Sequence, residues 1–125
     1  MKQQKFSIHQ RVRSFGYAWN GLKILFGEEH NSRIHLVAAV VVLIAGYFFQ
    51  LSALEWMAIV FAIGWVFTLE ILNSAIENIA DFVSPAMDDH IKKIKDLSAA
   101  AVLVGALTAV VIGLIVFVPK ILNLF

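Results

Sequence analysis

Five polar side chains between residues 70 and 81 are the part of this chain best suited to chemistry: Glu70, Asn73, Ser74, Glu77 and Asp81. They come directly after a long apolar segment. At about 100° per residue, these positions fall within an arc of about 100° on one helical face. Acidic side chains at the end of a membrane helix indicate a functional site, because such charges are costly there.

The spacing of two of these acids predicts a division of labour. Glu70 and Glu77 are two turns apart, or about 10 Å along a helix axis, which is too far for both to hold one bare ion. We expect the deeper Glu70 to accept a proton from a lipid hydroxyl. We expect the shallower Glu77 to hold Mg²⁺ on nucleotide phosphates.

The remaining parts of a phosphoryl-transfer site lie elsewhere in the chain: a second metal ligand at Glu28 or Glu29, a cation for phosphate at Lys95 and an orienting amide at Asn73. Metal, cation, base and positioning groups are what that chemistry needs. The chain lacks both the P-loop motif and the glycine-rich loop of protein kinases. A nucleotide site here is therefore not one of the common soluble types.

The composition indicates a single all-α membrane domain over residues 1–125, with 60% hydrophobic and 15% charged residues. Three apolar stretches predict membrane spans at about 32–50, 53–82 (including a cytoplasmic extension) and 92–120. An N-terminal segment at about 6–29 repeats apolar residues at spacings of three and four: Val12, Phe15, Trp19, Leu22 and Phe26. This pattern predicts an amphipathic helix that lies on the membrane surface.

The distribution of basic residues predicts the orientation. Lys and Arg occur before the first span and between the second and third, whereas none lies between the first and second. The positive-inside rule then places the N-terminal helix, the second loop and the acidic stripe in the cytoplasm. The net charge of +1 gives no reason to expect a nucleic-acid partner.

Three sequence blocks resemble the small prokaryotic integral-membrane lipid kinases, the diacylglycerol kinase and undecaprenol kinase family. The blocks are Glu70-Ile-Leu-Asn-Ser-Ala-Ile-Glu77 followed by Asp81, Gly16-Tyr-Ala-Trp-Asn-Gly-Leu22, and Lys95-Asp-Leu-Ser-Ala-Ala100. They stand in that family's order, and the resemblance runs from about residue 15 to residue 122. It implies an ATP-dependent kinase of a bacterial inner membrane, built as a homotrimer with active sites between protomers.

The resemblance also implies roles for individual residues. Glu70 would be the general base; Glu29 and Glu77 would bind Mg²⁺ with ATP. The nucleotide contacts would be Tyr17, Glu29, Asn73, Glu77, Lys95 and Asp96, with either Arg11 or Arg13 replacing the basic residue that the family has where this chain has Gln10. Trp19 and Ala99 are expected beside Glu70 at the lipid substrate.

The identity of the lipid rests on smaller blocks. Glu29-His-Asn31 with His35, Leu54-Glu-Trp-Met57 and Val118-Pro-Lys-Ile-Leu122 are more similar to undecaprenol kinases. Undecaprenol is therefore the favoured substrate and diacylglycerol the alternative. A non-enzymatic membrane subunit and an ion-coupled transporter are the competing classes. A transporter needs acids near the bilayer midplane, whereas these acids lie at one end of a span.

Overall fold

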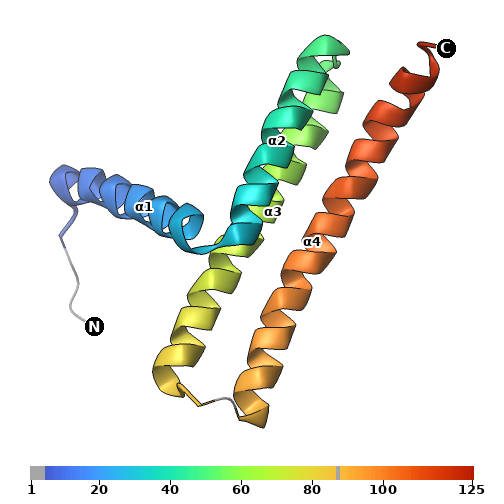
Figure 1. The fold of residues 1–125 in the computed structure, drawn as a ribbon. Helices are drawn as coiled ribbons and strands as arrows, with labels where there is room; N and C mark the ends of the chain where they lie inside the picture. The colour runs from blue at the N-terminus through green and yellow to red at the C-terminus, as the bar shows by residue number, and fades with distance from the viewer. Residues whose placement is uncertain (1–4, 87) are drawn as a thin grey trace.

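Four helices make up the computed structural model, which describes residues 5–86 and 88–125. They are α1 (Ile8–Glu28), α2 (His30–Phe48), α3 (Ala53–Val83) and α4 (Asp89–Leu122), with no strand among the described residues. Helices α2, α3 and α4 run side by side, and α1 projects away from them (Figure 1). The C-terminus lies at the same end as the turn between α2 and α3.

A tight turn makes α2 and α3 antiparallel neighbours. Gln50 adopts a left-handed backbone conformation (φ 53°) that reverses the chain. Ser52 then caps α3 in a capping box: its hydroxyl accepts the backbone N–H of Glu55, and the Glu55 carboxylate accepts the backbone N–H of Ser52. Lys120 of α4 lies 3.1 Å from the same Glu55 carboxylate, which ties α4 to this end of α3.

Small side chains let α3 approach α2 and α4 closely. The buried residues of α2 recur every seven positions, at Ser32, Ala39 and Gly46. Three of the four buried residues of α4 do the same, at Ile91, Ser98 and Gly105. A Cβ on Gly105 would collide with the Leu69 side chain of α3, so only glycine fits this crossing without a shift.

The far end of α3 stops where the sequence forbids further helix. The last helical residue is Val83, two positions before Pro85. Helix α4 begins after Asp88, whose side chain accepts the backbone N–H of Ile91. This short connection makes α3 and α4 a long antiparallel pair.

Helix α1 meets α2 at a corner held by one arginine. Ser7 caps the start of α1, and Leu25 near its end is buried. Arg33 of α2 donates to the carbonyl oxygens of Phe26 (2.7 Å) and Gly27 (2.8 Å), which are free at the helix end. Glu29 lies between the two helices, and its backbone N–H donates to the Leu25 carbonyl oxygen.

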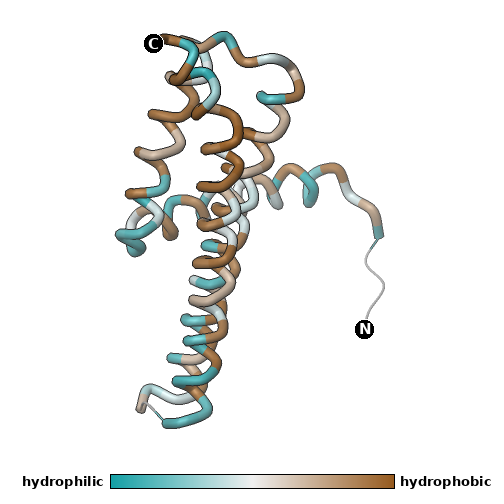
Figure 2. Tube along the Cα trace, turned by 90° about the vertical axis from the view of Figure 1, so that its right-hand side faces the viewer, coloured by the Kyte–Doolittle hydropathy of each residue, from teal (hydrophilic) through white to brown (hydrophobic). Residues whose placement is uncertain are grey.

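The prediction of an all-helical membrane protein is confirmed. Three helices, α2, α3 and α4, are long and apolar enough to cross a bilayer. Hydrophilic residues gather on α3 and α4 near the loop that joins them, whereas the rest of these helices is mostly hydrophobic (Figure 2). That α1 lies on the membrane surface stays a prediction, as do the trimer and the extent of the single domain.

Candidate active site

Glu70 lies on the same face of α3 that packs the bundle together. The buried residues Ile59, Ala62, Val66 and Glu70 follow each other at spacings of three and four. Glu70 is only 4% exposed. The core of the helix pair therefore continues directly into a buried carboxylate, which is rare unless the charge is paired.

Two side chains of α2 contact the Glu70 carboxylate. The Ser32 hydroxyl donates a hydrogen bond to Oε2. His35 Nε2 lies 3.2 Å from Oε1, at ion-pair distance. Oε1 itself is buried and has no hydrogen-bond partner among the described residues.

A polar cavity of about 150 Å³ opens at this carboxylate. It lies between α2, α3 and α4 and is lined by Glu29, Asn31, Ser32, Glu70, Asn73, Glu77, Ala99 and Val102. On its α4 side, Ser98 donates a hydrogen bond of 2.6 Å to Asn73 Oδ1, which fixes the orientation of that amide. The three predicted carboxylates Glu29, Glu70 and Glu77 thus face one space.

The carboxylates that line this cavity suit a cation that binds together with phosphate. Among the described residues, no three or more His, Cys, Asp or Glu side chains form a cluster that could hold a metal ion by themselves. Glu29 and Glu77 nevertheless line the same cavity. Mg²⁺ commonly takes one or two carboxylates and completes its shell with substrate phosphates and water.

One turn beyond the cavity, one ion pair joins the ends of α3 and α4, and a second lies within α4. Lys95 Nζ lies 2.5 Å from Asp81 Oδ1, and Lys92 Nζ lies 2.6 Å from Asp96 Oδ2. Lys95 and Asp96 are therefore engaged outside the cavity in this chain. Asp81, which the sequence left without a role, holds the cation that was predicted to meet phosphate.

The two predicted site residues of α1 also lie outside the cavity. Tyr17 is 71% exposed and Trp19 is 62% exposed, on the helix that projects from the bundle. Arg11, one of the two candidate nucleotide contacts there, lies over the Phe6 ring, 5.9 Å from its centroid. A single chain therefore brings together Glu29, Glu70, Asn73, Glu77 and Ala99, and leaves the residues of α1 apart from them.

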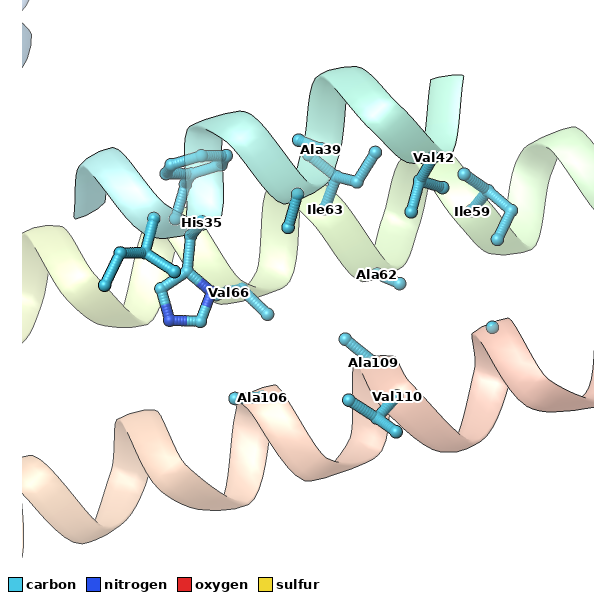
Figure 3. A pocket seen from close by; sticks show the side chains of 14 residues that line it. His35, Ala39, Val42, Ile59, Ala62, Ile63, Val66, Ala106, Ala109 and Val110 are labelled. Carbon is cyan, nitrogen blue, oxygen red and sulfur yellow. The ribbon is translucent and has the colours of Figure 1, made fainter. Parts of the chain in front are cut away.

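An apolar groove of about 320 Å³ begins beside Glu70 and runs along the bundle away from the polar cavity. It lies between the α2–α3 pair and α4 (Figure 3), and its lining includes Ala39, Ile63, Ala106 and Val110. His35 is its most polar lining residue and also contacts Glu70. The groove and the polar cavity therefore meet at the Glu70–His35 contact.

No site role was predicted from the sequence for Ser32, His35 or Ser98. A signal for the α2 residues was present, because positions 32, 35, 39 and 42 follow the spacing of one helical face. Ala39 and Val42 make this face apolar along most of α2. Ser32 and His35 are the two polar side chains at its beginning. The partner of Ser98 lies 25 residues away on another helix, so its role required the fold.

Comparison with known proteins establishes the family. Residues 16–117 match the family model described as prokaryotic diacylglycerol kinase. The undecaprenol kinase of Bacillus subtilis is 38% identical over 95% of this chain and 97% of its own length. The diacylglycerol kinases of Synechocystis and Escherichia coli K12 are 35% and 28% identical over 89% and 80% of this chain, and over 64% and 82% of their own lengths. The chain therefore belongs to the prokaryotic diacylglycerol kinase family.

Proposed function

We propose that this protein is an ATP-dependent lipid kinase that transfers the γ-phosphate of ATP to the hydroxyl of undecaprenol. The observation that carries the proposal is the meeting of an apolar groove and a polar, acid-lined cavity at one buried carboxylate, Glu70. An amphiphilic alcohol has the matching form: a hydrocarbon chain for the groove and a hydroxyl for the carboxylate.

Glu70 is the general base in this proposal. Its Oε1 is buried and lacks a hydrogen-bond donor among the described residues, so a substrate hydroxyl can supply one. A carboxylate in hydrogen-bond reach of that hydroxyl accepts its proton while the lipid oxygen attacks the γ-phosphorus. Asn73, oriented by Ser98, holds a phosphate group or the lipid hydroxyl in line.

Glu29 and Glu77 are the proposed ligands of Mg²⁺. Both residues line the polar cavity. Glu77 lies about two helical turns from Glu70 along α3. When bound with ATP, Mg²⁺ supplies neutralisation of the charge that develops on the phosphates. The sequence blocks shared with the family support nucleotide contacts from Tyr17, Lys95 and Asp96 as well.

The lining of the groove favours a prenyl alcohol over diacylglycerol. Aside from His35, the residues that line it are aliphatic, aromatic or glycine. Diacylglycerol carries two ester carbonyls beside its hydroxyl, and these need hydrogen-bond donors or water. Undecaprenol carries hydrocarbon up to its hydroxyl. Similarity to the Bacillus subtilis undecaprenol kinase over nearly the whole chain supports the same choice.

The membrane and assembly assignments rest on charge and on the family. The lysines and arginines flanking the spans support a bacterial inner membrane location with the N-terminus and active site on the cytoplasmic side, where ATP is available. A homotrimer with sites between protomers would explain why Tyr17 and Trp19 lie outside the cavity of a single chain.

The direct test is transfer of labelled phosphate from MgATP to lipid by the purified protein in detergent. Undecaprenol and diacylglycerol are assayed side by side, with the variant Glu70→Gln as the blank. We expect phosphorylation of undecaprenol with the higher kcat/KM. A preference for diacylglycerol would establish the alternative substrate, and transfer to neither lipid would support a non-enzymatic subunit.

A groove-blocking variant tests where the hydrocarbon chain lies. Ala109→Phe adds a ring to a residue that lines the groove, whereas Val111→Phe adds one to a residue that is exposed outside it. We expect Ala109→Phe to raise the KM for undecaprenol and to spare the KM for MgATP. Val111→Phe is the matched control. Equal effects of the two variants would place the lipid chain elsewhere.

A further inference from the structure

Two side chains of α2 hold the Glu70 carboxylate from the same side. Ser32 and His35 are three residues apart, so both lie on the face of α2 that packs against α3. Ser32 is 1% exposed, and its hydroxyl donates a hydrogen bond to Glu70 Oε2. His35 Nε2 faces the other oxygen at 3.2 Å.

The two oxygens of Glu70 are therefore not equivalent. Oε2 accepts a charge-assisted hydrogen bond, which is among the stronger interactions in proteins. Oε1 is buried and accepts no hydrogen bond from the described residues. Leaving a buried carboxylate oxygen in that state is costly, so the site is completed when a donor arrives.

The position of Oε1 indicates which donor that is. Oε1 is the oxygen beside His35, and His35 lines the apolar groove. Glu70 itself lines the polar cavity. A hydroxyl at the end of a hydrocarbon chain in the groove would meet Oε1 before it met any other carboxylate of the cavity.

From these contacts, and resting on the proposed function, we propose that Ser32 and His35 are positioning residues that make Oε1 of Glu70 the proton acceptor. Ser32 fixes the rotation of the carboxylate through Oε2, and His35 keeps Oε1 at the junction of groove and cavity. The lipid O–H bond then breaks with its proton on Oε1. The lipid oxygen bonds to the γ-phosphorus, and the bond from that phosphorus to the bridging oxygen breaks to release ADP.

Kinetics of α2 variants test this positioning. Ser32→Ala removes the hydroxyl, and His35→Leu removes the polar ring at a place where an apolar side chain fits the groove. We expect each to lower kcat with undecaprenol about ten- to hundredfold, the range expected for a misplaced catalytic group, with little change in the KM for MgATP. His35→Gln retains a polar side chain beside Oε1 and should recover part of the loss.

Matched controls separate positioning from folding. Thr108→Ala removes a hydroxyl that bonds within α4, to the Val104 carbonyl, and His9→Gln changes an exposed histidine of α1. Both should keep wild-type kcat. Thermal unfolding in detergent should show His35→Leu at least as stable as wild type. A structural role for His35 predicts the opposite: lost stability and an unchanged kcat in the folded fraction.

Infrared spectroscopy tests the same contacts without turnover. Subtracting the spectrum of Glu70→Gln from that of wild type isolates the Glu70 carboxylate band. We expect this band to shift in Ser32→Ala and in His35→Leu and to stay in place in Thr108→Ala. An unmoved band together with unchanged kcat would overturn the positioning roles. If wild type transfers no phosphate, the proposed function fails, and the band positions still decide whether Ser32 and His35 hold Glu70.

Discussion

Two glutamates of one helix, Glu55 and Glu70, show how the same side chain serves two purposes in α3. Glu55 lies in the first turn, with 28% of its side chain exposed, and both of its contacts stabilise the fold. It closes the capping box with Ser52 and pairs with Lys120 of α4. Glu70 lies 15 positions later, is buried, and keeps one oxygen without a hydrogen bond from the described residues.

The difference indicates that one end of α3 stabilises the fold and that the other end carries the candidate site. The Glu55 end satisfies its polar groups inside the chain and packs Leu51, Ile59 and Val116 into a small core. The Glu70 end lines a cavity and leaves acceptors for something outside the chain. We therefore expect changes at the first end to alter unfolding, and changes at the second end to alter turnover.

The largest effect is expected from Glu70→Gln. The amide keeps the size of the side chain and cannot take a proton from a hydroxyl, so kcat for lipid phosphorylation should fall by about 10²–10⁴, the usual contribution of a general base. Initial rates with undecaprenol and MgATP measure it. Glu55→Gln, the matched change at the other end of α3, should stay within about twofold of wild type after correction for the folded fraction.

A smaller loss is expected from Glu77→Gln and Glu29→Gln. Each removes one proposed ligand of Mg²⁺ and leaves the base intact, so MgATP binding should weaken about tenfold or more, as for loss of a charged contact of about 1.5–3 kcal/mol. Nucleotide binding titrated at several Mg²⁺ concentrations checks this. Raised Mg²⁺ should restore part of the MgATP affinity of each variant. A variant that binds MgATP as tightly as wild type at every Mg²⁺ concentration would show that its residue is not a metal ligand.

Next in size is the effect of Glu55→Gln on stability. The change weakens both the capping box and the contact with Lys120, so the unfolding temperature should fall. Thermal unfolding in detergent measures it, and Lys120→Met should reproduce only the ion-pair part. A stability equal to wild type would show that this end of α3 is held mainly by its apolar contacts.

The smallest effect is expected in the turn beside Glu55. Gln50 has a positive φ of 53°, which glycine adopts more easily. Gln50→Gly should therefore stabilise the fold by about 0.5–1 kcal/mol, since relief of strain exceeds the extra entropy that glycine loses. A higher unfolding temperature for this variant, with unchanged turnover, would support a purely structural role for this end of α3. Destabilisation would show that Gln50 makes contacts that outweigh its backbone strain.

The sequence predicted the helices and the shared helical face of three cavity-lining residues, for physical reasons. Long apolar runs and Pro85 determine spans by local chemistry, and the 3.6-residue period placed Glu70, Asn73 and Glu77 on one face. The contacts of Ser32, His35 and Ser98 depend on how helices far apart in sequence are turned toward each other. Lys95 shows the same limit, because its pairing with Asp81 emerges only when α3 and α4 are side by side.

The most direct test of the division of labour measures MgATP binding and lipid phosphorylation on the same preparations of Glu70→Gln and Glu77→Gln. The account predicts that Glu70→Gln binds MgATP with nearly wild-type affinity and transfers almost no phosphate to undecaprenol. It predicts that Glu77→Gln loses MgATP affinity and recovers measurable transfer at high MgATP. Equal loss of nucleotide binding in the two variants, or wild-type transfer by Glu70→Gln, would contradict it.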